Sequence, residues 1–154
     1  MSNVAFLQKA HVFDDLLVRD AISWKALISG YAQNGQSNEE FDCFEKMQTD
    51  GLSPDAITFT CILTACGNIG AIDKANQIHD EILTRRLLEK NIVLGNGMVD
   101  MYVRCDNLKD ACIIFERLDH CNIVVCSALI IGLTRQGHGH KALMLFDQMR
   151  QQNN

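Results

Sequence analysis

The sequence predicts an all-α fold made of repeated helix–turn–helix units, because three features recur along it. The first is an aromatic-sized marker residue, which stands at intervals of 31, 35, 36 and 31 residues: Phe13, Phe44, His79, Phe115 and Phe146. The second is an apolar residue three positions after each marker, as on one face of a helix: Leu16, Met47, Ile82, Leu118 and Met149. The third is a turn residue nine positions before the last four markers: Gly35, Gly70, Asp106 and Gly137. Repetition at this spacing is typical of a helical repeat array.

Four units are expected after a short opening segment. Residues 1–20 contain only a second helix, near residues 6–17, so we expect the array to begin mid-unit and the chain to be cut from a longer one. The later units cover residues 21–55, 56–91, 92–122 and 123–154. Because no linker interrupts them, we expect a single domain over residues 1–154, a continuous solenoid of about nine helices.

Each unit has a turn between two amphipathic helices. In the first complete unit, a helix near residues 22–33 ends at Asn34. The second helix is expected to have Ser37 or Asn38 as its cap. Later turns are expected at residues 67–70 and 105–107. The expected core of the first complete unit is Trp24, Leu27, Ile28, Tyr31, Phe41, Phe44 and Met47.

Composition agrees with this fold class and restricts the partners. A content of 47% hydrophobic and 21% charged residues in 154 is ample for a folded core, and a single proline argues against a sheet. The net charge of −5 has the wrong sign for holding a polyanion by bulk charge. Any nucleic-acid binding must therefore come from a local surface.

Seven cysteines are expected to be buried, reduced thiols, because their number is odd and no secretory signal opens the chain. The longest uncharged stretches, residues 56–72 and 120–134, are at or below the length of about 17 residues that a membrane span needs. No targeting segment is readable at the start. The cysteines are Cys43, Cys61, Cys66, Cys105, Cys112, Cys121 and Cys126.

Several segments resemble pentatricopeptide repeats of the plant PLS subclass: SWKALISGYAQNGQ, ITFTCILTACGNIGAIDKANQIH, GNGMVDMYVRC and SALIIGLTRQGHGHKALMLFDQM. The unit lengths of 35, 36 and 31 residues match its P, L and S units, whereas a tetratricopeptide array keeps a period of about 34 residues. The resemblance implies a right-handed α-solenoid with a partial S repeat (1–20), a P repeat (21–55), an L repeat (56–91), an S repeat (92–122) and a truncated P repeat (123–154). Lys9 and Glu40 depart from the pattern, because the later units have alanine four residues before the marker.

Proteins of this family are implied to bind single-stranded RNA in chloroplasts or mitochondria, one base per repeat, for RNA editing or another processing step. The residue at the fifth position of a unit and the residue just before the next unit together face one base. These base-reading residues are Lys25 with Asp55, Thr60 with Asn91, Asn96 with Asn122, and Ser127, whose partner lies past the end of the chain.

The resemblance assigns bases to two of these pairs. Asn96 with Asn122 suggests a pyrimidine, with cytosine favoured. Thr60 with Asn91 suggests adenine if L units read bases as the other units do. Lys25 either pairs with Asp55 or reaches a phosphate, so the base of that unit is unassigned.

Two further positions of each unit carry residues that are candidates for contact with RNA. The second position of each unit carries an aliphatic residue that the resemblance makes a plate beside a base, the alternative being ordinary packing at a helix start: Ile22, Ile57, Val93 and Val124. The thirteenth position carries residues that either touch the phosphate backbone or form a solvated face: Gln33, Asn68, Arg104 and Arg135. Because only Arg104 and Arg135 are cationic, few phosphate contacts and weak affinity are expected.

No catalytic or metal site is expected. The combination of HxE with CxxC that a zinc deaminase needs is absent. The spacing of the histidines and cysteines in the C-terminal third fits no established metal site: His120, Cys121, Cys126, His138 and His140. The acids Glu39, Glu40, Asp80, Glu81 and Asp110 are expected on helix faces that meet solvent.

The sequence therefore predicts a recognition module that is not an enzyme and needs no cofactor. Its expected partners are single-stranded organellar RNA and editing-factor proteins or a deaminase supplied in trans, with neither DNA nor a membrane. The alternative is a scaffold of helical repeats for protein–protein interaction, which the acidic balance leaves open.

Overall fold

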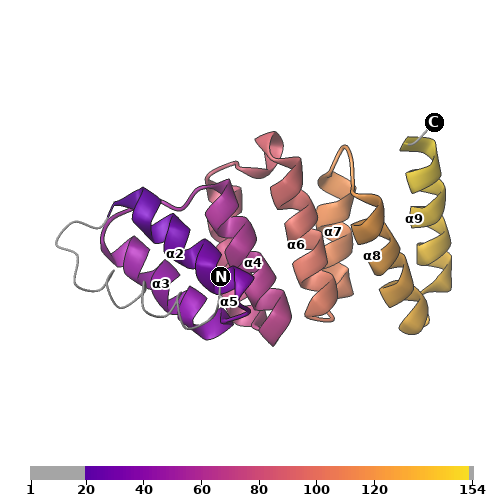
Figure 1. The fold of residues 1–154 in the computed structure, drawn as a ribbon. Coiled ribbons are helices and arrows are strands. Elements are labelled where there is room, and N and C mark those ends of the chain that lie inside the picture. The colour runs from indigo at the N-terminus through magenta and orange to yellow at the C-terminus, as the bar shows by residue number, and fades with distance from the viewer. Residues whose placement is uncertain (1–19, 153–154) are drawn as a thin grey trace. The chain divides into compact units, whose positions relative to one another are not determined.

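The computed structural model describes residues 20–152, and the described chain is helical without a strand (Figure 1). One short 3₁₀-helix, Leu88–Lys90, precedes the third unit. The helix predicted near residues 6–17, with Phe13 and Lys9, lies outside the described residues. The described α-helices are α2 (Ala21–Gln33), α3 (Ser37–Thr49), α4 (Ala56–Ile69), α5 (Ile72–Thr84), α6 (Ile92–Arg104), α7 (Leu108–Arg117), α8 (Ile123–Arg135) and α9 (Gly139–Gln152). The helices α2, α4, α6 and α8 begin at the first residues of the four predicted units.

The described residues form two compact parts, 20–65 and 66–152. In the first part α2 and α3 pack together as a hairpin, and the first turns of α4 complete the core. Phe44 and Phe59 meet edge to face, with ring centroids 6.0 Å apart and an interplanar angle of 62°. This geometry is favourable for an aromatic pair. The marker Phe44 therefore contacts the first helix of the following unit.

The second part contains two further helical hairpins, α6 with α7 and α8 with α9. The helix α6 also packs against α5 and α8, so the first helices of successive units lie against each other. Met98, Tyr102, Phe115 and Leu129 are buried in this core. In contrast, the last marker, Phe146, is 43% exposed, because no helix follows α9 in the described residues to cover it.

The predicted turn positions adopt the left-handed backbone that their residue types tolerate. The φ angles are 69° at Gly35, 67° at Gly70 and 80° at Gly137. Asp106, which replaces glycine in the third unit, has a φ of 58°. Aspartate is among the few residues with a Cβ that adopt this conformation with any frequency. The repeat pattern therefore located these four turns correctly.

Two local predictions were wrong. The cap of α3 is Gln36, which makes no side-chain capping bond, and Ser37 is instead the first helical residue and buried. The turn expected at residues 67–70 is shorter, because α4 continues through Gly67 and Asn68 to Ile69. An added Cβ at Gly67 would lie 2.9 Å from Cδ of Arg104, so the arginine side chain would have to shift to make room for it.

Glu40 was predicted to face solvent, and this prediction was wrong. Its side chain is 2% exposed, because it stands four residues before the marker Phe44 on the buried face of α3. The alanines at this place in later units, Ala75, Ala111 and Ala142, are buried as well. Burial raises the pKa of Glu40 to about 8. Its Oε1 atom has no hydrogen-bond partner in the described part of the chain.

All seven cysteines lie in the described residues and are free thiols; four are buried, and Cys61, Cys105 and Cys121 are half-buried.

No helix of the described chain combines the length and the apolar composition that crossing a bilayer requires. Among the same residues, no group of three or more His, Cys, Asp or Glu side chains is placed to hold a metal ion.

Candidate nucleic-acid interface

The aliphatic residues at the second position of each unit are the most exposed large hydrophobic side chains of the described residues. Their relative exposures are 77% for Ile22, 69% for Ile57, 67% for Val93 and 70% for Val124. Packing at a helix start would bury these side chains, so they do not belong to the core. Each compact part therefore has two exposed aliphatic side chains at this repeat position, and exposed apolar side chains without a folding role are typical of contact surfaces.

The residue just before each unit is the N-cap of the first helix, and in three of four cases its side chain makes the capping bond. Oδ1 of Asp20 accepts from Ser23 N at 2.8 Å, and Oδ1 of Asp55 accepts from Thr58 N at 2.9 Å. Oδ1 of Asn122 accepts from Val124 N at 2.8 Å. Capping fixes the direction of these side chains. Oδ1 of Asp20 and of Asp55 accepts a second bond from a serine or threonine hydroxyl, whereas Oδ1 of Asn122 accepts only the capping bond among the described residues.

The third base-reading pair is brought together. Asn96 extends from α6, and its Oδ1 accepts a hydrogen bond of 2.9 Å from the backbone N–H of Asn122. Because backbone N–H groups can only donate, these bonds identify the oxygen of each side-chain amide. Each Oδ1 accepts one bond and keeps one acceptor site, and the two Nδ2 groups are the donors of the pair. Val93 and Val124 stand at the second positions on either side of this pair.

The first base-reading pair is joined by an ion pair. Nζ of Lys25 lies 2.8 Å from Oδ2 of Asp55, with side-chain exposures of 34% and 41%. Of the two alternatives for Lys25, the structure shows the contact with Asp55. Partial burial acts to raise the pKa of Asp55, but hydrogen bonds from Lys25 and Thr58 and the charge of Lys25 outweigh it and lower that pKa.

The remaining predicted readers have hydroxyl groups engaged within their own helices. Thr60 Oγ1 donates to the carbonyl oxygen of Ala56 at 2.8 Å, and Ser127 Oγ donates to that of Ile123 at 2.7 Å. Each oxygen keeps its acceptor capacity. Asn91 is the N-cap of α6 but makes no side-chain capping bond. Thr60 and Asn91 belong to different compact parts.

The two arginines of the predicted phosphate row differ in their surroundings. Arg104 Nη1 donates to Asn68 Oδ1 at 2.8 Å, and its Nε lies 3.0 Å from Oδ2 of Asp100. Asn68 is the thirteenth residue of the preceding unit, so the arginine bridges two units. Arg135, the last residue of α8, is exposed. A phosphate contact from Arg104 would have to compete with both existing bonds.

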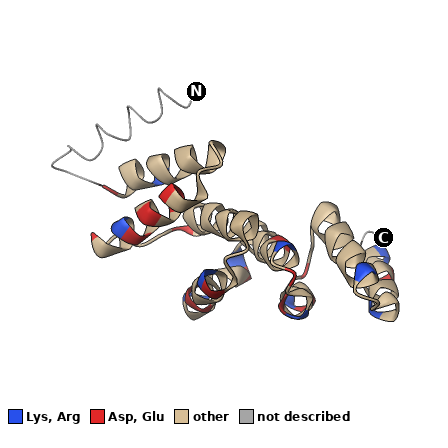
Figure 2. Cartoon of the chain, turned by 90° about the horizontal axis from the view of Figure 1, so that it is seen from below, with Lys and Arg blue, Asp and Glu red and all other residues tan. Residues whose placement is uncertain are grey.

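Charged side chains are unevenly distributed over the helices (Figure 2). The helix α4 has none, α2 has only Lys25 and α8 only Arg135. The helix α3 carries a series of acids, and several blue segments lie in the hairpin of α8 and α9. The helices α2, α4 and α8 are therefore poor in cationic side chains, so any RNA binding by them would depend on base contacts more than on phosphate contacts.

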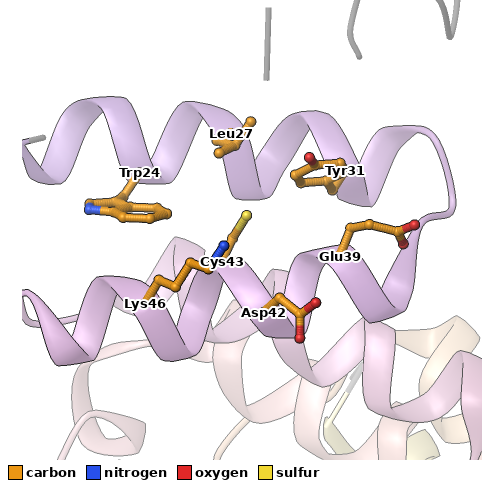
Figure 3. A pocket seen from close by; sticks show the side chains of 7 residues that line it. All are labelled: Trp24, Leu27, Tyr31, Glu39, Asp42, Cys43 and Lys46. Carbon is orange, nitrogen blue, oxygen red and sulfur yellow. The ribbon is translucent and has the colours of Figure 1, made fainter. Parts of the chain in front are cut away.

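A small hollow of about 100 Å³ lies between α2 and α3 (Figure 3). Trp24, Leu27 and Tyr31 line it from α2, and the side chains opposite them are Glu39, Asp42, Cys43 and Lys46 of α3. Trp24 Nε1 also donates to Asp50 Oδ2 at 3.0 Å. None of the predicted base-reading residues lines this hollow, so it is separate from the candidate interface.

His79 has a packing role. Its ring meets Tyr102 edge to face at 5.6 Å, as expected for a filler that faces the neighbouring unit. Tyr102 Oη donates to Asn76 Oδ1 at 3.0 Å, so the contact of 2.6 Å between His79 Nδ1 and Tyr102 Oη has the imidazole as donor. Burial lowers the pKa of His79, with Arg117 adding to the effect and Asp80 and Asp110 opposing it. Glu81, which completes an HxE spacing with His79, is paired with Arg85.

Comparison with known families accounts for this architecture. Residues 19–68 match the model of the PPR repeat family, and residues 57–87, 96–123 and 124–154 each match the PPR repeat. The chain belongs to the pentatricopeptide repeat family. The three matched repeats correspond to α4 with α5, to α6 with α7, and to α8 with α9.

Relatives of the chain in Arabidopsis thaliana are also named as pentatricopeptide repeat-containing proteins. A pentatricopeptide repeat-containing protein of Arabidopsis thaliana is 38% identical over 141 residues, covering 92% of this chain and 20% of the relative. A second from the same plant, named as mitochondrial, is 32% identical over 139 residues, covering 90% and 22%. The chain thus spans about a fifth of the length of these two relatives.

The solved structures confirm the fold class. The pentatricopeptide repeat protein PPR10 in complex with an 18-nt psaJ RNA element has a TM-score of 0.69 at 19% identity, covering 94% of this chain and 22% of PPR10. The crystal structure of PPR10 from maize has a TM-score of 0.63 at 20% identity, covering 97% of this chain and 22% of PPR10. The predicted all-α solenoid of helical repeats is therefore confirmed.

Proposed function

We propose that this chain is an RNA-recognition segment that binds single-stranded RNA with one base per unit. The observation that carries the proposal is the combination of exposed aliphatic residues and fixed polar pairs at the two complete sites that the structure describes. Membership of the pentatricopeptide repeat family supports it, as does the RNA element bound by PPR10. The unit lengths of 35, 36 and 31 residues support assignment to the PLS subclass.

Each proposed site has an apolar and a polar component. A base is flat and apolar on both faces, so it gains by lying between two aliphatic side chains such as Val93 and Val124. Its edge then meets the side chains of Asn96 and Asn122. The exposed plates supply affinity that is indifferent to sequence, and the polar pair supplies the choice of base.

The hydrogen bonds within the third site support the proposed preference for cytosine. Backbone N–H groups hold both Oδ1 atoms, so the two Nδ2 donors are oriented away from those bonds. Cytosine presents two adjacent acceptors, O2 and N3, to such a pair. Uracil has an N–H group at N3, which would face a donor, and a buried polar group left unpaired is costly.

The biological setting follows from the family. We propose that the protein acts in a chloroplast or mitochondrion, in RNA editing or another processing step, and that an editing factor or a deaminase supplied in trans performs the chemistry. One relative is named as mitochondrial, which agrees with an organellar setting. The small number of cationic residues on the first helices predicts that this segment alone binds weakly and with a shallow salt dependence.

The test is the exchange Asn122→Asp. Aspartate keeps the capping acceptor at Oδ1 but turns the remaining donor into an acceptor, which suits the N3–H group of uracil. We expect the ratio of affinities for cytosine and uracil probes to shift by about fivefold or more towards uracil, since one base-edge contact is worth about 1 kcal/mol or more. Affinity is measured by titration of short fluorescent RNAs at low salt.

Asn38→Asp is the matched control, because Asn38 is exposed in the first turn of α3 and the exchange adds the same charge away from the site. An unchanged ratio for Asn122→Asp would overturn the assignment of this pair. If no single-stranded RNA binds at millimolar protein at low salt, RNA recognition by this segment is refuted and the protein-docking scaffold is favoured instead.

A further inference from the structure

Two cysteines stand on either side of the start of α8, at the positions of a hydrophobic staple. The N-cap of α8 is Asn122, so Cys121 precedes the cap and Cys126 is the fourth residue of the helix. Side chains at these two positions often pack together and fix the angle at which the chain enters a helix. At the start of α4 the same positions carry Pro54 and Phe59, and both are buried. In α8 both are thiols, which pack as small apolar groups but can also form a covalent bond.

One carbonyl group joins the two cysteines. The backbone oxygen of Asn122 accepts a bond of 2.9 Å from the N–H of Cys126, and Sγ of Cys121 lies 3.6 Å from the same oxygen as a weak donor. Burial raises the pKa of the Cys121 thiol. Hydrogen bonding and charge at the Cys126 thiol raise that pKa further, whereas the backbone N–H of Cys126 acts against this. The two thiols are therefore neighbours.

The two thiols differ in their access to solvent. Cys126 is 2% exposed on the buried face of α8. Cys121 is half-buried in the connection between α7 and α8, and the residues on both sides of it, His120 and Asn122, are exposed. A reagent in solution can therefore reach Cys121 far more readily than Cys126. This difference sets the order of any reaction, with Cys121 first and Cys126 second.

We propose that Cys121 and Cys126 are a redox-active pair, which a small-molecule disulfide oxidises to a protein disulfide across the start of α8. The inference does not depend on RNA binding. The Cys121 thiolate attacks one sulfur of the small disulfide, which forms a mixed disulfide and releases one small thiolate. The Cys126 thiolate then attacks the sulfur of Cys121, which forms the protein disulfide and releases the second small thiolate. The two thiol protons pass through water to these thiolates, so the small disulfide gains two electrons and the protein loses them.

The new bond would act on the first turn of α8. The closed loop runs from Cys121 to Cys126 and includes the capping bond from the N–H of Val124 to Oδ1 of Asn122. A covalent link restricts the open chain more than the folded one when its two ends already pack together. Oxidation should therefore slow the local opening of this turn and protect the N–H of Cys126 from exchange with solvent.

The test uses the full chain, reduced and then incubated with excess glutathione disulfide at mildly alkaline pH, where thiolates form. After acid quenching and alkylation of the remaining thiols, peptide mass spectrometry gives the state of each cysteine. Both cysteines lie in one tryptic peptide, 118–135, which contains no other cysteine. The variants are Cys121→Ser, Cys126→Ser and Cys126→Ala. Cys61 is the internal control, because it is also half-buried and no cysteine contributes to its raised pKa.

In the wild type, this peptide should lose the mass of two hydrogen atoms and carry no glutathione. In both variants of Cys126, glutathione should remain on Cys121, because the thiol that displaces it is missing. In Cys121→Ser, Cys126 should react about tenfold or more slowly than Cys121 does in the wild type, because it is buried. Cys61 should form no protein disulfide. Exchange of the Cys126 N–H should be about threefold or more slower in the oxidised wild type, and dithiothreitol should reverse this.

Three outcomes would overturn the inference. The first is glutathione that persists on Cys121 of the wild type, and the second is reaction of Cys126 at the same rate with and without Cys121. The third is a disulfide between two chains, seen as two copies of the peptide joined together. Unchanged exchange of the Cys126 N–H after oxidation would refute the constraint on α8. Circular dichroism melts show that each variant is folded under the conditions of the reaction.

Discussion

Replacing Glu40 by alanine gives the sharpest stability test, because it restores the residue that the later units carry at the same place. Glu40 is 2% exposed, and its Oε1 lacks a hydrogen-bond partner among the described residues. A buried carboxyl group in such a place stays protonated until the pH is high. The exchange removes the buried acid and leaves the backbone of α3 free to remain helical.

The magnitude follows from the pKa, which burial raises from 4.5 to about 8. Below pH 4.5 the carboxyl is protonated in both the folded and the unfolded chain, so it has no effect on the pH dependence. Between pH 4.5 and 8 only the unfolded chain releases the proton, and the free energy of unfolding falls by up to about 1.4 kcal/mol for each pH unit. Over the whole window the loss reaches at most about 5 kcal/mol.

The assay is urea unfolding of the wild type and of Glu40→Ala between pH 5 and pH 8.5, followed by circular dichroism. We expect the difference in unfolding free energy between the two proteins to grow in favour of the variant as the pH rises to 8. Glu39→Ala is the matched control, because Glu39 is exposed one residue earlier. Parallel pH profiles for wild type and Glu40→Ala would refute the conclusion that this carboxyl is buried and neutral.

Three further predictions concern other parts of the chain. Arg135→Ala should lower the slope of log affinity against log salt by about one, measured with short RNAs. Arg104→Ala should change that slope less. It should instead lower the urea midpoint, because the bonds of Arg104 to Asn68 and Asp100 are lost. The wild type should lose stability as the pH falls below 6.5, because the pKa of His79 is lowered in the folded chain and only the unfolded chain gains the proton there. His79→Phe should remove this loss. If urea melts of the two proteins show the same dependence on pH below 6.5, the prediction is contradicted. Gly137→Ala should cost about 1 kcal/mol in thermal melts, because its φ is 80°, whereas Gly139→Ala, where an added Cβ meets no atom within 4 Å, should cost nothing; equal effects would contradict the strain argument.

The repeat positions that the sequence predicted correctly are those fixed by local chemistry. The left-handed turn at Asp106 was predictable, because a turn-forming residue recurs nine positions before each of the last four markers. The starts of α2, α4, α6 and α8 were predictable for the same reason. The burial of Glu40 was missed, although the alanines at its repeat position carried the signal. The charge of Glu40 predicted an exposed side chain, whereas its repeat position places it on the buried face of α3.

The sequence by itself determined the helical repeat, the unit boundaries and the residues that recur at each position, because helix periodicity and turn chemistry act over only a few neighbouring residues. The tertiary structure alone decided which polar atoms are still available. It showed that capping occupies Oδ1 of Asp55 and Asn122, that Lys25 is held by Asp55, and that Arg104 is already bonded. The capping bonds are local, whereas the contacts of Lys25 with Asp55, of Asn96 with Asn122 and of Arg104 with Asn68 join residues 26 to 36 positions apart. Such contacts form only when successive hairpins pack against each other.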